Sequence, residues 1–307
     1  MARRSGDPGG VMETRRIRRA PAAGGFSERI VGAVLFAAIF LGTLIWGALP
    51  FTFAVALAAV IGSIELFSLF ETKGQATPTA AAVGIAGSLA YVFLAHYKPV
   101  ESIGYVTIGV IFVSFMWYMF VLRHVKPTKA VALTVFAPLL TGLCLSYFVL
   151  LRDTASRASL HHSRGWWIVL FVVLLIWVYD ICAWAVGRKI GRRKMAPSIS
   201  PNKSWEGTIA GTLGVLAASA LFRLVIVAIN GGREFPWFTY GCAMVIGVIV
   251  VVFGPLGDLS ESLVKRDYGV KDMGKMIPGH GGIMDRFDSS FFTVPIVYYV
   301  VFYFFIR

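Results

Sequence analysis

Long apolar runs alternate with short polar segments along almost the whole chain. A helix needs roughly 20 mostly apolar residues to cross the hydrocarbon core of a bilayer. By that measure the pattern predicts nine spans, near residues 30–48, 51–71, 79–96, 101–122, 130–151, 165–187, 206–229, 236–256 and 288–306. The predicted fold is therefore an all-α, polytopic integral membrane protein with about nine transmembrane helices.

The composition agrees with this prediction and excludes a soluble globular protein. Of the 307 residues, 57% are hydrophobic and only 15% are charged, and the mean hydropathy is +0.73. A soluble domain carries about a quarter charged residues and cannot hide so much apolar surface. Cys144, Cys182 and Cys242 fall in three different predicted spans. We therefore expect them to be small packing residues, with neither a disulfide framework nor a zinc site.

The polar segments divide the chain into three parts. Residues 1–28 are rich in Arg, Gly, Pro and Ala and lack periodicity, which predicts a disordered basic tail. Residues 29–164 hold the N-terminal transmembrane helices, and residues 165–307 hold a candidate catalytic transmembrane region with polar loops at 188–205 and 257–287. The basic cluster at 15–19 is either a determinant of topology alone or also a contact for anionic lipid head groups.

Basic residues are distributed unevenly between the two sides of the predicted topology. With the tail inside, 22 of the 29 Lys and Arg residues fall in inner segments and 6 in outer segments. Because short basic loops stay in the cytosol, this predicts a cytosolic N-terminus and cytosolic polar loops, in a multi-pass protein of the cell membrane. The net charge of +13 is then largely a topology signal, and we expect no nucleic-acid partner.

Six carboxylates lie within the predicted spans or at their ends, close to the cytosolic level: Glu65, Asp180, Glu206, Asp258, Asp285 and Asp288. Ionisable groups within a membrane are costly and are functional candidates by default. A single cytosolic site is the simplest explanation of their common level. Two alternatives stay open, because Asp180 is equally well explained by an ion pair with Arg188 or Lys189, and Glu65 by a structural contact with a loop cation.

The loop at 188–205 carries hydroxyl, amide and ammonium donors directly before a predicted helix. These donors belong to Ser198, Ser200, Asn202, Lys203 and Ser204. Free backbone N–H groups at a helix N-terminus favour anions, so the loop is a candidate phosphate site. The alternative is a positive-inside loop with a Ser/Pro turn and a helix cap at Ser204.

The loop at 257–287 begins with a candidate helix break. The sequence GPLG at 254–257 predicts that the preceding span ends there. If a helix restarts directly afterwards, Asp258, Ser262 and Lys265 share one of its faces.

The carboxylates on either side of this loop suggest a metal site. Asp285 and Asp288 share a face at the start of the last span, and Asp258 lies at the other end of the loop. Hard oxygen ligands from two chain segments suit Mg²⁺, which keeps several waters and shares its other positions with substrate phosphates. The alternative is that these carboxylates only neutralise neighbouring Arg and Lys side chains.

Two further residues of the loop, Lys275 and His280, are candidate phosphate contacts. Residues 269–276 match the P-loop spacing GxxxxGK, but Met276 replaces the required Ser or Thr and Pro278 blocks the following helix. A soluble P-loop fold is therefore excluded. Lys275 can still contact a phosphate, and His280 is either a phosphate donor or an ordinary loop histidine.

At these loops the sequence resembles a known family. The run SLVKRDYGVKDMGKMIPGHGGIMDRFD at 262–288 is similar to the signature of the phosphatidate cytidylyltransferases, or CDP-diacylglycerol synthases, without a departure. The run SPNKSWEG at 200–207 resembles a second family motif, usually SPKKTWEG, from which Asn202 and Ser204 depart mildly. Residues 180–191 are also similar. The resemblance covers about 165–307, and the first half matches only as hydrophobic spans.

The resemblance implies transfer of CMP from CTP to phosphatidic acid, within a membrane of lipids and with Mg²⁺ as cofactor. We assign Asp258, Asp285, Lys265 and Arg266 as candidate catalytic residues. The candidate substrate-binding residues are Ser200, Lys203, Ser204, Lys271, Lys275, His280, Gly281, Gly282 and Arg286. Asp258, Asp285 and Asp288 are assigned to the metal, a second cation is left open, and Asp180, Glu206 and Glu65 are supporting residues.

Two other functions stay open beside this one. The first is another CTP-dependent lipid phosphotransferase, such as a polyprenol kinase or an ether-lipid cytidylyltransferase. The second is an ion-coupled transporter, although transporters usually place their ionisable groups near the midplane between repeats, and no repeat is visible here. The resemblance also implies a homodimer, but nothing in the sequence indicates an interface.

Overall fold

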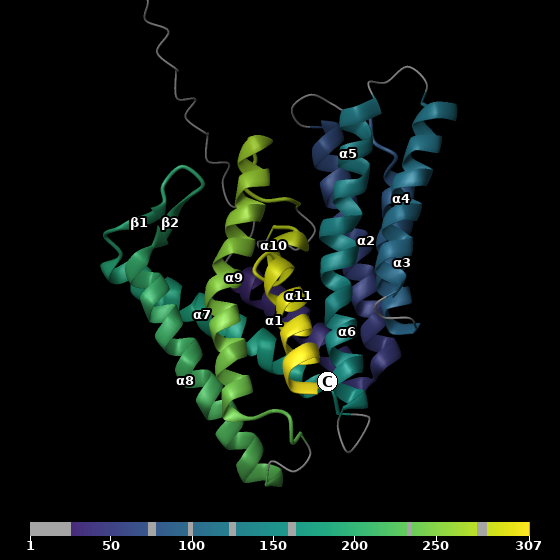
Figure 1. Ribbon diagram of the computed structural model, residues 1–307. Helices are drawn as coiled ribbons and strands as arrows, with labels where there is room; N and C mark the ends of the chain where they lie inside the picture. The colour runs from purple at the N-terminus through teal and green to yellow at the C-terminus, as the bar shows by residue number, and fades with distance from the viewer. Residues whose placement is uncertain are drawn as a thin grey trace, which may run out of the picture.

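The computed structural model describes residues 26–72, 78–97, 101–122, 127–158, 164–231, 235–274 and 281–306, which are almost entirely helical (Figure 1). The helices are α1 (Phe26–Trp46), α2 (Ala48–Thr72), α3 (Ala81–Tyr97), α4 (Glu101–Phe120), α5 (Pro127–Pro138), α6 (Cys144–Arg157), α7 (Trp166–Ile190), α8 (Trp205–Asn230), α9 (Tyr240–Asp267), α10 (Met284–Phe287) and α11 (Ser290–Val301). Two π-helical turns, η1 (Leu139–Leu143) and η2 (Phe302–Ile306), extend α5 and α11. Because α1 begins at Phe26, the last residues of the predicted 1–28 tail are helical, and residues 1–25 lie outside the described residues.

Helices occupy all nine predicted spans, but their lengths divide them into two groups. Six are long and apolar enough to cross a membrane: Ala48–Glu71, Ile103–Phe120, Pro127–Arg157, Trp166–Ile190, Trp205–Ile229 and Tyr240–Asp267. The apolar helices Val34–Trp46, Ala81–Tyr97 and Ser290–Ile306 are shorter. The described residues thus form a polytopic helical membrane protein with six candidate spans, and the count of nine stays a prediction.

The predicted helix break at 254–257 is wrong. Helix α9 continues through Pro255 to Asp267, so the polar loop behind it shortens to residues 268–283. A proline inside a helix removes one backbone hydrogen bond, and membrane helices tolerate this where neighbouring groups compensate. Asp258 therefore lies within a long helix and not at the start of a new one.

The loop predicted at 188–205 contains a β-hairpin, whose strands are the only ones among the described residues. β1 (Lys194–Ala196) and β2 (Ser200–Ser204) pair antiparallel, with Lys194 opposite Ser204 and Ala196 opposite Ser200. This small sheet is an exception to the all-α prediction. The helix cap predicted at Ser204 is confirmed, because its Oγ accepts a hydrogen bond from the N–H of Gly207 in the first turn of α8 (3.3 Å).

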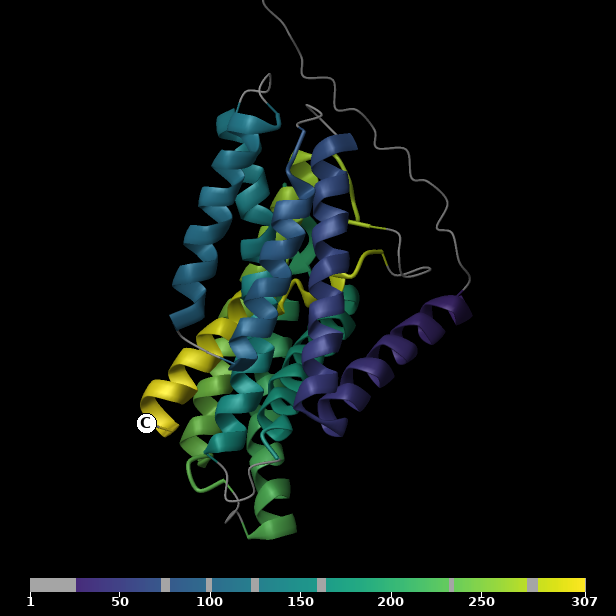
Figure 2. The same cartoon turned by 90° about the vertical axis from the view of Figure 1, so that its right-hand side faces the viewer.

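Helix α11 connects two groups of helices. On one side α7 packs on α8 and α8 on α9, and on the other side α2, α3, α4 and α6 pack together. Between these groups α11 packs against both α9 and α6 (Figure 1). α1 packs mainly on α2, and its N-terminal end leans away from the other helices (Figure 2).

Three phenylalanines fix α1, α6 and α10 to one another. The ring centroid of Phe40 lies 5.6 Å from that of Phe148 and 5.7 Å from that of Phe287, and Phe148 lies 5.8 Å from Phe287, all edge to face. The three rings are almost completely buried. Edge-to-face pairs of this kind add to the burial of apolar area, so the short helix α10 has a defined position.

A buried group of three hydroxyls joins α2, α3 and η1. The Oγ of Ser63 lies 2.8 Å from that of Ser88 and 2.7 Å from Oγ1 of Thr141, and Ser88 and Thr141 are 3.0 Å apart. Helices in a membrane gain no hydrophobic driving force against lipid, so such interhelical hydrogen bonds help to set their packing.

We expect Thr141→Val to lower the free energy of unfolding by about 1 kcal/mol, because it keeps the shape but leaves two buried hydroxyls with fewer partners. Unfolding of the detergent-solubilised protein, followed by fluorescence, measures the change. The matched control is Thr43→Val, whose hydroxyl bonds only to carbonyl oxygens of its own helix and whose loss should have little effect. Equal effects of the two changes would contradict a role of the hydroxyl group in helix packing.

Candidate active site

A cavity with a volume of about 250 Å³ lies between α1, α6, α7, α9 and the turn that joins α10 to α11. Four carboxylates line it: Asp180 from α7, Asp258 from α9, Asp285 from α10 and Asp288 from the turn. Arg286 also lines the cavity, and so do the apolar side chains of Phe36, Phe40, Phe148 and Trp177. The lining therefore combines acidic and apolar side chains.

Helix α9 presents Asp258, Ser262 and Lys265 on one face, as their spacing predicted. The Oγ of Ser262 donates to Oδ1 of Asp258 (3.4 Å), and both Ser262 and Lys265 are buried. Gly257 lets this face approach the turn before α11, since a Cβ at that position would lie 2.3 Å from the carbonyl oxygen of Asp288. The glycine thus allows Asp258 to lie next to Asp288.

Lys203 and Arg266 join the two polar loops to each other. The Nζ of Lys203, in β2, lies 2.8 Å from Oδ2 of Asp258 and donates to the carbonyl oxygen of Pro255 (3.2 Å). The Nε of Arg266, at the end of α9, donates to the carbonyl oxygen of Ile199 in the hairpin turn (3.2 Å). The hairpin is thus fixed to α9 at two points, and Lys203 lies next to a carboxylate that lines the cavity.

Lys265 is held between two carboxylates, Glu261 and Asp285. Its Nζ lies 2.7 Å from Oε2 of Glu261 and 2.8 Å from Oδ1 of Asp285, and none of the three side chains is more than 9% exposed. Breaking a buried ion pair leaves an uncompensated charge at high cost, so each group depends on the others. Glu261 was not predicted from the sequence. Its only signal there is the four-residue spacing to Lys265, which is common on ordinary helix surfaces.

The second carboxylate oxygen of Asp285 binds backbone N–H groups of the polar loop between α9 and α10, here called the glycine-rich loop. Oδ2 accepts hydrogen bonds from the N–H groups of Gly282 (2.7 Å) and Met273 (3.1 Å). Gly281 has a φ of 81°, in the left-handed region that favours glycine, and a Cβ there would lie 2.7 Å from Oδ2 of Asp285. Both oxygens of Asp285 are thus used within the protein, and the two glycines let the loop close on it.

Glu65 of α2 binds the start of α10. Its two carboxylate oxygens accept hydrogen bonds from the backbone N–H groups of Ile283 (3.0 Å) and Met284 (3.2 Å), and the residue is buried. Its hydrogen-bond partners among the described residues are these backbone groups, whereas Lys275, a candidate cation partner in the loop, lies outside the described residues. Negative side chains are favourable at helix N-termini, because the free N–H groups there carry partial positive charge. Glu65 therefore anchors the segment that carries Asp285 and Asp288.

Asp180, Asp258 and Asp288 form an acidic group around the cavity. Asp180 is exposed to the cavity, and the charges of Asp258 and Asp288 act on it. The charge of Asp258 acts on Asp288 as well. Such mutual repulsion is relieved by a bound cation, and carboxylate oxygens are the ligands that Mg²⁺ prefers. Among the described residues no three His, Cys, Asp or Glu side chains are placed so that they could hold one metal ion, so a cation here would contact at most two of these carboxylates and take its other oxygens from substrate or water.

The remaining predicted residues lie around this centre in different roles. Glu206 accepts hydrogen bonds from the backbone N–H groups of Arg192 and Arg193 (both 3.1 Å) and so orders the entry to the hairpin. Among the described ion pairs none joins Asp180 to Arg188 or Lys189, and the Arg188 guanidinium lies 5.5 Å from the ring centroid of Trp184. Ser200 is half-buried and Lys271 is exposed, while Lys275 and His280 lie outside the described residues.

Comparison with known proteins extends the resemblance from the two loops to the whole chain. A model of the cytidylyltransferase family matches residues 27–304. A phosphatidate cytidylyltransferase of Bacillus subtilis is 32% identical over 278 residues, which cover 89% of this chain and 97% of the relative. A phosphatidate cytidylyltransferase of Synechocystis is 30% identical over 294 residues (90% and 96%), and one of Haemophilus influenzae is 41% identical over 144 residues (47% and 48%). Since the match includes the N-terminal helices as well as both polar loops, the chain belongs to the cytidylyltransferase family.

Proposed function

We propose that the protein transfers CMP from CTP to phosphatidic acid, forming CDP-diacylglycerol and pyrophosphate in phospholipid synthesis. The observation that carries the proposal is the meeting of two polar loops at one cavity between membrane helices. Lys203 from the hairpin and Lys265 from α9 each bind a carboxylate that lines this cavity. Relatives named phosphatidate cytidylyltransferase, matched over nearly their whole length, support the same reaction.

This reaction requires positioning and charge neutralisation more than proton transfer. A phosphate monoester has a second pKa of about 6, so the lipid nucleophile is already largely ionised at neutral pH. Its oxygen attacks the α-phosphorus of CTP, a new P–O bond forms, and pyrophosphate leaves with the electron pair of the broken bond. Fixed cations stabilise the charge on the phosphates during this step. Lys203, whose side chain is 21% exposed, can exchange Asp258 for a phosphate, and Arg266 holds the hairpin turn that follows β1 against α9.

The lining of the cavity suits an amphipathic substrate. Its polar side chains would hold the phosphate of phosphatidic acid beside the phosphates of CTP. Its apolar side chains, which include Phe36 and Trp177, would hold the glycerol and acyl part of the lipid. Holding both reactants in one orientation supplies a large share of the rate enhancement in such reactions.

Asp258 and Asp288 are the residues that would hold Mg²⁺, with Asp180 as a supporting negative charge at the same cavity. When bound, the ion would neutralise and orient the CTP phosphates. This assignment changes the one made from sequence, because Asp285 uses its oxygens for Lys265 and for backbone N–H groups. We therefore infer that Asp285 positions Lys265 and the glycine-rich loop. Whether a second cation binds is left open.

We further propose nine spans with a cytosolic N-terminus, in the cell membrane, and an active site at the cytosolic face. The hairpin and the C-terminal ends of α7 and α9 lie at one end of the helices (Figure 1), which supports placing both basic loops on one side. The positive-inside rule makes that side the cytosol. A homodimer remains part of the proposal on the family resemblance alone.

The direct test of the function uses full-length protein in detergent with Mg²⁺, phosphatidic acid and CTP labelled in either the α- or the γ-phosphate. Transfer of CMP puts the α-label, and not the γ-label, into a lipid-soluble product. A CTP-dependent lipid kinase does the reverse. Replacing phosphatidic acid by a polyprenol or an ether lipid shows whether the protein uses one of these acceptors instead. Absence of any lipid-soluble label would leave transport as the better interpretation.

We expect Asp258→Asn and Asp288→Asn to lower turnover by about two orders of magnitude or more and to raise the Mg²⁺ concentration needed for half-maximal activity, because each removes a charged ligand. Asp285→Asn should lower turnover without a comparable shift in the Mg²⁺ titration, since it releases Lys265. Asp267→Asn, exposed at the end of α9, is the control. Activity that persists without divalent cations would contradict the metal assignment.

Glu261→Gln is expected to lower kcat/KM by about 10- to 100-fold, because Lys265 loses one of its two charged partners and the reacting groups lose their fixed position. Steady-state kinetics on the correctly inserted protein measure the effect. Ser260→Ala is the control, since its hydroxyl bonds only to the carbonyl oxygen of Leu256 in the same helix. If Glu261→Gln keeps wild-type kinetics, the buried ion pair has no positioning role.

The proposed topology predicts which introduced cysteines react from outside the cell. In a variant without the three native cysteines, Ser198→Cys and Asp267→Cys should react with an impermeant thiol reagent only after permeabilisation. Pro236→Cys, exposed before α9, should react in intact cells. Labelling of either cytosolic position from outside would overturn the orientation.

A further inference from the structure

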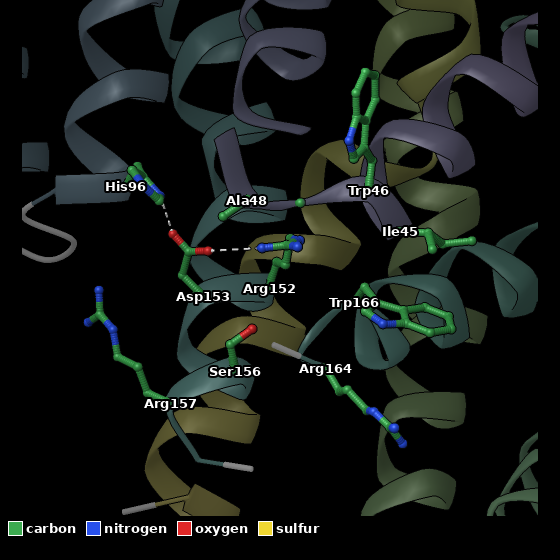
Figure 3. A pocket seen from close by; sticks show the side chains of 11 residues that line it. Ile45, Trp46, Ala48, His96, Arg152, Asp153, Ser156, Arg157, Arg164 and Trp166 are labelled. Carbon is green, nitrogen blue, oxygen red and sulfur yellow. Dashed lines mark hydrogen bonds and ion pairs between the residues drawn. The ribbon is translucent and has the colours of Figure 1, made fainter. Parts of the chain in front are cut away.

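A second cavity, with a volume of about 510 Å³, lies where α1 and α6 end and where α2 and α7 begin (Figure 3). This is the opposite end of α7 from Asp180 and the hairpin, so the cavity is separate from the candidate active site. We propose that it binds the phosphate group of an anionic phospholipid at that membrane surface. The proposal concerns a ligand site and does not depend on the reaction proposed above.

The charges around this cavity favour an anion. Among the described lining residues, Arg152, Arg157 and Arg164 contribute three guanidinium groups and Asp153 one carboxylate. That carboxylate is already engaged, because its Oδ2 lies 2.6 Å from Nδ1 of His96 and its Oδ1 lies 3.6 Å from Nη1 of Arg152. Arg164 takes part in a further interaction, but Arg152 and Arg157 alone already outnumber Asp153, which favours an anionic ligand.

Arg152 is the buried part of this site. Only 5% of the residue is exposed, and ionisable groups within membrane domains are functional candidates by default. Its contacts with other described residues are long: Nε donates to the carbonyl oxygen of Leu44 at 3.4 Å, and Nη1 lies 3.6 Å from Asp153. A guanidinium carries five N–H donors in a planar fork that matches a phosphate. These two contacts leave donors of Arg152 at the cavity, with Arg157 and Arg164 on opposite sides of Ser156 (Figure 3).

Gly165, directly before α7, packs closely against the end of α6. The N–H of Gly165 donates to Oγ of Ser156 (3.0 Å). A Cβ on Gly165 would lie 2.1 Å from the carbonyl oxygen of Arg152, so no larger side chain fits there without a backbone shift. This close approach places Arg164 and Trp166 beside the end of α6, and the cavity is a fixed feature of the fold.

The surroundings of the cavity favour a lipid over a free phosphate ion. Trp46 is 81% exposed and Ile45 is 55% exposed, and both line the cavity together with Trp166. Tryptophan is enriched where membrane helices meet the head-group region, because its ring is apolar and its N–H is polar. A ligand that has a phosphate and an acyl chain can use both the arginines and this apolar rim, whereas inorganic phosphate can use only the arginines.

The test measures binding of short-chain phosphatidylglycerol to full-length protein in a non-ionic detergent by isothermal titration calorimetry, with phosphatidylcholine and inorganic phosphate as comparison ligands. We expect saturable binding of phosphatidylglycerol and weaker binding of the other two. The double variant Arg157→Gln/Arg164→Gln should raise the apparent Kd about tenfold or more, because it removes charge-assisted contacts. Both arginines are exposed, so the variant should fold and keep the enzyme activity.

The matched control is Arg193→Gln, which removes an exposed arginine at the hairpin end and should leave the Kd unchanged. An unchanged Kd in the double variant would overturn the proposal. An equal loss in Arg193→Gln would overturn it too, since the attraction would then be non-specific. If inorganic phosphate binds as tightly as phosphatidylglycerol, the cavity is a free-anion site and the lipid assignment is wrong.

Discussion

The arrangement of the active site depends on one buried ammonium group. Lys265 reaches Glu261 on its own helix and Asp285 on the segment before α11, so it joins α9 to the chain that carries Asp285 and Asp288. A lone charge at this depth costs several kcal/mol, which means that the three groups must be buried together or not at all. Once they meet, the second oxygen of Asp285 is directed to the N–H of Gly282. The position of this glycine is then a consequence of pairing a charge.

The N-terminal helices position the acidic segment through one carboxylate and two aromatic rings. Glu65 of α2 accepts hydrogen bonds from the backbone of Ile283 and Met284. The edge-to-face contacts of Phe287 with Phe40 and Phe148 fix the same short helix from α1 and α6. The acidic segment is therefore positioned from both halves of the chain, although its resemblance to the family was visible only in the C-terminal half.

The sequence was sufficient to predict features that depend on neighbours along the chain. Apolar run lengths indicated the helices, and helical spacing placed Asp258 and Lys265 on one face. Features that depend on distant neighbours could not be predicted. The contact of Glu65 with Ile283 spans 218 residues, and Glu261 looks like an ordinary helix-surface residue until its burial is known. Pro255 indicated a helix end by a local rule, but α9 continues with Gly257 packed against the turn at Asp288.

The two cavities are lined by an excess of charge of opposite sign. The described lining of the carboxylate cavity holds four negative groups, those of Asp180, Asp258, Asp285 and Asp288, and one positive group, that of Arg286. The neighbouring side chains of Lys203, Lys265 and Glu261 reduce this acidic excess but do not cancel it. Around the arginine cavity the excess is positive. Charge in a partly dehydrated site has to be compensated nearby. In the two proposals made here, a cation would compensate the acidic excess and an anionic lipid the positive one, at opposite ends of the same helices.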